Sequence, residues 1–481
     1  MLDIPQIYNH ITSIALLVLC FALQLGAAII FWNDLKTNNN RISNGILFIL
    51  NINLGMQVVI PNIIGYFNGY SVEGMLNIRP DDLLVTTLVH AISLLCFLFA
   101  FKYNSLLSII RSRAEINAVV RTKITRVERV EVEDKVLVIL LAIGYYILWS
   151  NFSFSLIQVS STSDIAIYTT TIFEWSSIVA SIIVITLYKG NFLLKIFAAA
   201  LFLGFQVYFL SKGLRGGLLI FIILFPFYLY VKRGYIDFKL VLIGVLAVIP
   251  IFPYLGGDFR AQLATTLLNA SPAERLESLM TGASSGSDEV SVIGATAASL
   301  EKIYQRLEAT RNSVSLINLY NNEKGVDLRP TVSSLAAFIP TRFWPSKNYP
   351  SSSTEDVNGT AMYVVKSETY GFTDMGPFLS SAHDYWEGGI FYTIISAILV
   401  GYGWRKLCEW GYRSGYSAIS LLVAGSLLDA HHGEISVISP LALNIKVAFF
   451  QIIPLVVFYI VIRLAFRLRI VTKQKLTRTK P

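Results

Sequence analysis

The segment that decides the fold reads FLLKIFAAALFLGFQVYFL, then SKGLRG, then GLLIFIILFPFYLYV, and runs from Phe192 to Val231. Two apolar runs flank a short basic, glycine-rich turn. A helix needs roughly 20 apolar residues to cross a hydrocarbon core about 30 Å thick. The runs Phe192–Leu210 and Gly217–Val231 therefore predict two membrane-spanning helices joined by a turn at the membrane surface. In the cytoplasm, Lys212 and Arg215 of this turn would be ordinary orienting charges. Outside, they would break the positive-inside rule and need another explanation.

The composition extends this interpretation to the whole chain. Hydrophobic residues make up 54% and charged residues 15% of the 481 residues, whereas a soluble protein is about one quarter charged. The chain is therefore predicted to be a polytopic membrane protein. Its formal charge of +8 fits the basic cytoplasmic loops of such a protein, and no nucleic-acid-binding motif accompanies it. No nucleic-acid partner is expected, and no disulfide, because none of the three cysteines lies in the long polar segment.

Apolar runs of near-spanning length recur along the chain. We predict an all-α fold with about 11 transmembrane helices and a large extracytoplasmic loop. The runs are Ile11–Trp32, Gly45–Phe67, Leu83–Phe101, Val136–Ile157, Thr171–Tyr188, Phe192–Leu210, Gly217–Val231, Lys239–Leu255, Gly388–Trp404, Ala418–Leu428 and Val447–Leu464. The run at Ala418 is short, so a broken or re-entrant segment is the alternative there.

Basic residues concentrate in every second loop, which predicts the orientation. They flank or fill these loops at Lys36, Arg41, Arg111, Arg113, Lys189, Lys232, Arg233, Arg405, Lys406 and Arg413, and again in the tail after Arg467. Because cytoplasmic loops carry the excess of lysine and arginine, this alternation predicts an outer N-terminus and a cytoplasmic C-terminus. It also places Lys212 and Arg215 outside.

The same alternation divides the chain into three regions. Residues 1–255 form an N-terminal transmembrane region of about eight helices, 256–387 a large outer loop, and 388–481 a C-terminal region of about three helices with a basic tail. A loop of that length is usually functional. Within it, apolar positions between Ser299 and Tyr320 recur at helical spacing, which predicts a helix that lies on the membrane or packs on the transmembrane bundle.

The outward-facing basic residues are candidate ligands of a phosphate group. Lys212, Arg215, Arg260, Arg342 and Lys347 all fall on the side where short loops are otherwise poor in basic residues. The planar guanidinium of arginine can hold a phosphate through two hydrogen bonds. A cluster of this kind suits a diphosphate headgroup whose lipid tail stays in the bilayer. The alternative is that these side chains reach lipid headgroups or pair with carboxylates of the loop.

Aromatic and acidic residues add candidate sugar-binding and acid–base groups. Trp344 lies in the proline-rich stretch Ile339–Pro350 between Arg342 and Lys347, where its ring could stack on a sugar or simply pack at the membrane interface. His383 and Glu387 are spaced to share one helix face, and either could act as general base toward a sugar hydroxyl.

Two further outward positions carry ionisable groups. The stretch Asp429–Glu434 contains adjacent histidines without a third ligand at a metal-like spacing, so His432 is a candidate proton carrier and no metal is expected there. Glu174, at the outer end of a span, is either a buried functional carboxylate or one that reaches the interface.

Three short motifs resemble those of the O-antigen and oligosaccharide repeat-unit polymerases (Wzy-type) of bacterial envelopes. They are the Ser-x-x-x-Arg-Gly turn at Ser211–Gly216, the Ile-Pro-x-Arg-x-x-Trp-Pro-x-Lys loop at Ile339–Lys347, and the entry to a span at His383–Gly389. The order of spans and the late outer loop are also similar. The chain departs from the family pattern in having Asn348 and Tyr349 before Pro350.

The resemblance implies a membrane glycosyltransferase with a multi-span, GT-C-like fold in the bacterial cytoplasmic (inner) membrane. It would transfer a glycan from undecaprenyl diphosphate to a hydroxyl of another lipid-linked repeat unit, without a metal or other cofactor. Arg215 would be the primary diphosphate ligand, Arg260 and Arg342 secondary ones, and His383, Glu387 or His432 the base. A chain-length regulator and a flippase of the same pathway would be partners.

Three other functions stay open at this point. An O-antigen ligase would use the same donor and transfer it to a lipid A core. A lipid-linked sugar flippase or other transporter would have polar and charged residues along the middle of several spans. A scaffold of the envelope assembly machinery would tolerate replacement of Arg215.

Overall fold

The computed structural model describes residues 4–37, 40–67, 79–102, 122–156, 164–188, 192–211, 216–235, 310–323, 331–332, 379–428, 437–438 and 440–478. These parts of the chain are almost entirely helical, as the all-α prediction requires. Each apolar run predicted from the sequence falls largely within a helix, except Lys239–Leu255, which lies outside the described residues.

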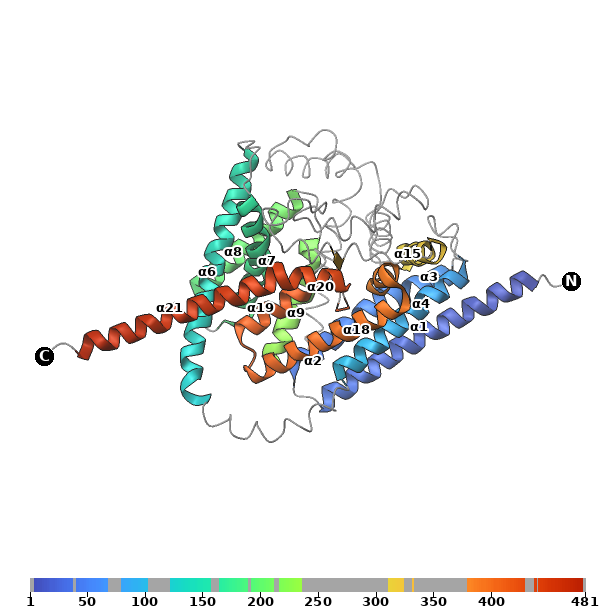
Figure 1. Cartoon of the computed structure of the whole chain (residues 1–481), viewed down its shortest axis with the longest axis horizontal. Helices are drawn as coiled ribbons and strands as arrows, with labels where there is room; N and C mark the ends of the chain where they lie inside the picture. The colour runs from blue at the N-terminus through green and yellow to red at the C-terminus, as the bar shows by residue number, and fades with distance from the viewer. Residues whose placement is uncertain are drawn as a thin grey trace, which may run out of the picture.

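One group of helices brings the N-terminal third of the chain beside a segment close to the C-terminus. In Figure 1, the orange α18 lies along the blue helices, and its main neighbour is α4. The group consists of α1 (Ile4–Thr37), α2 (Arg41–Leu54), the π-helical turn η1 (Gly55–Val59), α3 (Ile60–Phe67), α4 (Pro80–Lys102), α15 (Thr310–Glu323) and α18 (Ser380–Arg413).

A second group packs around α7 (Asp164–Leu187). It contains α6 (Thr122–Leu156), α8 (Phe192–Ser211), α9 (Gly216–Arg233), α19 (Ala418–Leu428), α20 (Leu441–Val447), the π-helical turn η3 (Ala448–Ile452) and α21 (Ile453–Arg478). Within the second group, the green α9 and the orange-red α19 lie nearest to the first group in Figure 1. The helix α9 contacts α2, and α19 contacts α18. Most of the buried apolar side chains of both groups form one core, and Leu443 and Val447 of α20 form a small separate cluster.

The described helices are suited to a lipid bilayer. Four of them contain segments long and apolar enough to cross a membrane: Ile11–Thr37, Arg41–Ile63, Pro80–Lys102 and Phe192–Phe209. Shorter apolar helices cover Phe173–Leu187, Ala418–Leu428 and Ile453–Ala465. Along α1, large apolar side chains such as Val18 and Leu25 are more than half exposed, which a bilayer tolerates and water does not. The number of crossings, about 11, stays a prediction.

Charged ends of several helices meet at one end of the bundle. The carboxylate of Asp34, near the end of α1, contacts Lys102 Nζ at the end of α4 and accepts a hydrogen bond of 3.1 Å from Ser43 at the start of α2. Arg41 Nη1 donates to the carbonyls of Val231 and Lys232 at the end of α9, at 2.8 and 2.9 Å. These contacts bring together basic residues from loops that the sequence assigned to a single side of the membrane.

The C-terminal half of α18 ends at the same place. The backbone N–H of Arg41 donates to the hydroxyl of Tyr416, just after α18, at 3.0 Å. Glu409 near the end of α18 accepts from Arg405 at 2.9 Å and from Lys406 at 3.2 Å. Partial burial raises the pKa of the Glu409 carboxyl, but these two cations outweigh it and bring the pKa below its ordinary value. The first residue of α18 therefore lies toward the opposite end of the bundle.

The helix α15, from the predicted outer loop, packs on the bundle rather than lying apart from it. Its side chains Val314, Leu316 and Ile317 are buried against α18 and α4. Four residues after Gln57, Pro61 lacks the N–H that would bond to the carbonyl of Gln57. The helix widens into the π-helical turn η1 just before Pro61. Thr310 of α15 donates its hydroxyl to that carbonyl at 3.0 Å. For residues 310–320 this confirms the second of the two placements predicted for the amphipathic stretch, and residues 299–309 lie outside the described part of the chain.

Close contact between α18 and α4 depends on a glycine. A Cβ atom placed on Gly401 would lie 2.5 Å from the carbonyl oxygen of Phe97 and 3.2 Å from the Cβ of Ala100. Small residues allow helix backbones to approach in this way inside membranes.

We predict that Gly401→Ala destabilises the protein by about 1–3 kcal/mol, because the added methyl group has to separate the two helices. The measurement is the midpoint of thermal unfolding of the purified protein in detergent. Gly403→Ala on the same helix is the matched control, since a Cβ there meets no atom within 4 Å. Equal midpoints for the two variants would show that this contact does not determine the packing.

Candidate functional site

The helix α18 starts with a short segment that is separated from the rest by two glycines. Leu379 is extended, and its N–H donates to Ser313 Oγ of α15 at 2.7 Å, so the helix begins at Ser380. It is interrupted at Gly388 and Gly389. Gly389 has a φ of +68°, which favours glycine, and a Cβ there would lie 2.6 Å from the hydroxyl of Tyr320. The chain thus forms two helical turns before the longer helix that follows.

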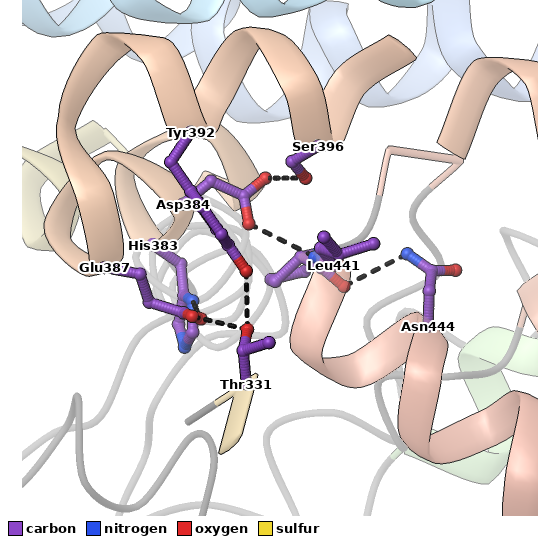
Figure 2. Close-up of polar contacts among 9 residues, drawn as sticks. Thr331, His383, Asp384, Glu387, Tyr392, Ser396, Leu441 and Asn444 are labelled. Atoms are coloured by element: carbon purple, nitrogen blue, oxygen red, sulfur yellow. Dashed lines mark hydrogen bonds and ion pairs between the residues drawn. The ribbon is translucent and has the colours of Figure 1, made fainter. Parts of the chain in front are cut away.

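Three ionisable side chains share one face of this short segment: His383, Asp384 and Glu387 (Figure 2). A helix turns by about 100° per residue, so these positions fall within an arc of about 100°. Each is at most 1% exposed. One potential ligand atom from each residue lies within 4.8 Å of the other two. We refer to these three residues as the α18 cluster.

His383 and Glu387 are in direct contact, as their spacing predicted. His383 Nδ1 lies 3.0 Å from Glu387 Oε1, and the imidazole meets the ring of Trp386 edge-on at 5.8 Å between centroids. The pair is well placed to share or exchange a proton, because either an imidazole nitrogen or a carboxylate oxygen can carry it.

Asp384 is held by donors from two other parts of the chain. Its Oδ2 accepts from Ser396 Oγ at 2.5 Å, and its Oδ1 accepts from the backbone N–H of Leu441 at 3.1 Å. Ser396 lies on α18 beyond the glycine break, and Leu441 begins α20. The carboxylate therefore joins the two halves of α18 to the start of the C-terminal helices, as Figure 2 shows.

Thr331 brings the predicted outer loop to the cluster. Its hydroxyl donates to Glu387 Oε2 at 2.5 Å and lies 2.5 Å from the hydroxyl of Tyr392. One threonine therefore orients both a buried carboxylate and a tyrosine of the helix that follows the break (Figure 2).

The cluster lies beside the middle part of an apolar helix rather than beyond its end. Ser381 Oγ is 3.1 Å from His90 Nδ1, and His90 is about 15 Å along α4 from Pro80 at a rise of about 1.5 Å per residue. Since Pro80–Lys102 is one of the four segments apolar and long enough to cross a membrane, the cluster packs against the middle of a candidate membrane span. Ionisable residues there mark a functional site by default.

Of the site residues predicted from the sequence, the structure brings His383 and Glu387 together. The others, Lys212, Arg215, Arg260, Arg342, Trp344, Lys347 and His432, lie outside the described residues, so their roles stay predictions. Glu174 lies on α7 and is half-buried.

Sequence reasoning missed two members of the arrangement. Asp384 lies next to His383 in the sequence, and plotting the stretch on a helical wheel would have placed it near the same face. Thr331 is 56 residues from Glu387 and carries no signal in the sequence, since threonine is common in loops. Only the fold reveals its contact.

We predict that Thr331→Val lowers stability by about 1–3 kcal/mol, because it leaves a buried carboxylate oxygen and a tyrosine hydroxyl without this partner. Thr331→Ser keeps the hydroxyl and should unfold close to the wild-type midpoint. Thermal unfolding of the three purified proteins compares them. A valine variant as stable as the serine variant would argue against the contact.

Comparisons with models of known protein families, with curated proteins and with solved structures find no match to this chain. Inference about its function therefore rests on its residues and on the geometry of the α18 cluster.

Proposed function

We propose that this protein is a membrane glycosyltransferase that polymerises undecaprenyl-diphosphate-linked oligosaccharide units on the outer face of the bacterial cytoplasmic membrane. The observation that carries the proposal is the burial of His383, Asp384 and Glu387 beside a candidate membrane span, in the motif that resembles the polymerases. Removing ionisable groups from water is unfavourable. A protein retains such groups where a reaction or transport step uses them.

The cluster supplies what glycosyl transfer needs on the acceptor side. The acceptor hydroxyl attacks the anomeric carbon of the donor glycan, the bond from that carbon to the diphosphate breaks, and the hydroxyl proton passes to a base. His383 and Glu387, 3.0 Å apart, form a pair that can take this proton. On the donor side, Arg215, Arg260 and Arg342 would neutralise the charge that develops on the departing diphosphate.

The orientation of the chain supports an outward-facing reaction. Arg41, Lys102, Lys232 and Arg405 lie at the end of the bundle where α18 finishes, and the positive-inside rule assigns such an end to the cytoplasm. The α18 cluster, near the start of the same helix, then lies in the outer half of the membrane, with the N-terminus outside and the C-terminus in the cytoplasm.

Access to the cluster would require a local movement. All three residues are buried, and Thr331 contacts Glu387 from the predicted outer loop. Displacement of this threonine on substrate binding would expose the carboxylate to an acceptor sugar. Binding energy from the lipid-linked substrate can drive such a change.

A transporter of lipid-linked sugars is the second candidate. The break of α18 at Gly388 and Gly389, next to ionisable groups beside a candidate membrane span, resembles the discontinuous helices that form binding sites in secondary transporters. An O-antigen ligase is a third, since it would share the donor and the outer face with a polymerase.

The glycan ladder of a deletion strain tests these functions against one another. We predict that the strain displays single repeat units and that the wild-type gene restores long chains, because a polymerase acts after the unit has crossed the membrane. Gel electrophoresis of the surface polysaccharide is the measurement. Absence of every unit would instead favour the transporter or the ligase, and a normal ladder would exclude all three.

Complementation with variants links the ladder to individual residues. Arg215→Ala and His383→Gln should leave single units, at a membrane protein level equal to that of the wild type. Glu409→Gln, which alters a carboxylate of α18 paired with Arg405 and Lys406, is the control and should restore long chains. Long chains in both Arg215→Ala and His383→Gln would contradict the assignment of these residues.

A further inference from the structure

We infer that His383, Asp384 and Glu387 form a binding site for a divalent cation, for which Mn²⁺ is the best fit. The three residues present an imidazole and two carboxylates from consecutive turns of one helix segment, with one candidate ligand atom of each within 4.8 Å of the others. The inference concerns what the cluster binds and goes beyond the proposed function.

Glu387 Oε1 is the atom that points to a ligand. It is fully buried and accepts no hydrogen bond from the part of the chain that the structure describes, although it lies 3.0 Å from His383 Nδ1. When the imidazole nitrogen that faces it carries no proton, this buried carboxylate oxygen has no donor there, and a cation held between the two atoms would compensate it.

The separation of these two atoms matches coordination of a single ion. Adjacent ligand atoms about 2.1 Å from an octahedral ion lie about 3.0 Å apart, and opposite ones about 4.2 Å apart. The widest spacing in the cluster, up to 4.8 Å, is slightly larger. A small change in a side-chain torsion closes that difference.

The second carboxylate oxygen of Glu387 and both oxygens of Asp384 are already oriented by hydrogen bonds. Thr331 donates to Glu387 Oε2, and Ser396 and Leu441 donate to Asp384. Carboxylates that bind metals are usually held in this way by surrounding donors, which leave a lone pair for the ion. The cluster thus has both the ligands and the supporting contacts of a metal site.

Charge and donor type select the ion. Among the described residues, neither Asp384 nor Glu387 forms an ion pair with a lysine or arginine, so with both carboxyls ionised the described part of the cluster carries uncompensated negative charge. A dication balances this charge. Carboxylate oxygens favour Mg²⁺ and Mn²⁺, whereas an imidazole favours transition metals, and Mn²⁺ satisfies both preferences.

With the cation bound, the imidazole and the carboxylates act as its ligands. A sugar hydroxyl that joined the coordination sphere would lose its proton more readily, because a bound dication stabilises the alkoxide. If the protein is a polymerase, the cation would make the acceptor hydroxyl more acidic, and the proton would pass to the carboxylate oxygen of Glu387 that the cation leaves free.

Electron paramagnetic resonance tests the site directly on the full-length protein, purified in nanodiscs and treated with a chelator before Mn²⁺ is added. We expect one equivalent of bound Mn²⁺ per chain and a nitrogen hyperfine coupling from the imidazole. Asp384→Asn should weaken binding at least about tenfold, and His383→Gln should abolish the nitrogen coupling. Glu409→Gln is the matched control and should bind Mn²⁺ as the wild type does.

Wild-type protein that binds no Mn²⁺, or Mn²⁺ without nitrogen coupling, overturns the site whatever the variants do. An Asp384→Asn variant that binds Mn²⁺ with wild-type affinity also overturns the site. This outcome can be separated from that of the proposed function. If the protein binds Mn²⁺ but its deletion leaves the glycan ladder intact, only the polymerase is refuted. If the ladder depends on the gene but the protein binds no Mn²⁺, only the cation site is refuted.

Discussion

The burial of three ionisable side chains beside an apolar helix is the constraint on which the arrangement around α18 depends. In such surroundings each polar atom needs a partner, because water does not supply one. Asp384 finds its partners in Ser396 and Leu441, and Glu387 finds one in Thr331. Thr331, α18 and the start of α20, which are separated along the chain, therefore converge on one place.

The packing of α18 against its neighbours also helps to position the α18 cluster. Gly401 allows α18 to approach α4 closely, and Ser381 in the short first segment of α18 contacts His90 of α4. Thr310 of α15 donates to the carbonyl of Gln57, and Ser313 of α15 accepts from the N–H of Leu379. The short helix that carries the cluster is thus held at its beginning by α15 and beyond its end by α4.

The helices could be predicted from the sequence because the length of an apolar run is a local property of the chain. The sequence also predicted that α15 would have a buried face, and that His383 and Glu387 would meet, since both follow from helical periodicity. It placed the start of a helix at Gly388, whereas the structure has helix on both sides of a break there. The contacts of Asp384 with Leu441 and of Glu387 with Thr331 join residues 57 and 56 positions apart, and no local pattern encodes them.

Buried ionisable groups contribute little to stability. Their presence beside a candidate membrane span therefore favours a role in function over a role in stability. The most direct test is Glu387→Gln, examined for both unfolding and glycan chain length. If the carboxylate serves a reaction, the variant unfolds at or above the wild-type midpoint while its polysaccharide is reduced to single units. A variant that unfolds well below the wild type yet makes chains of normal length would contradict this account.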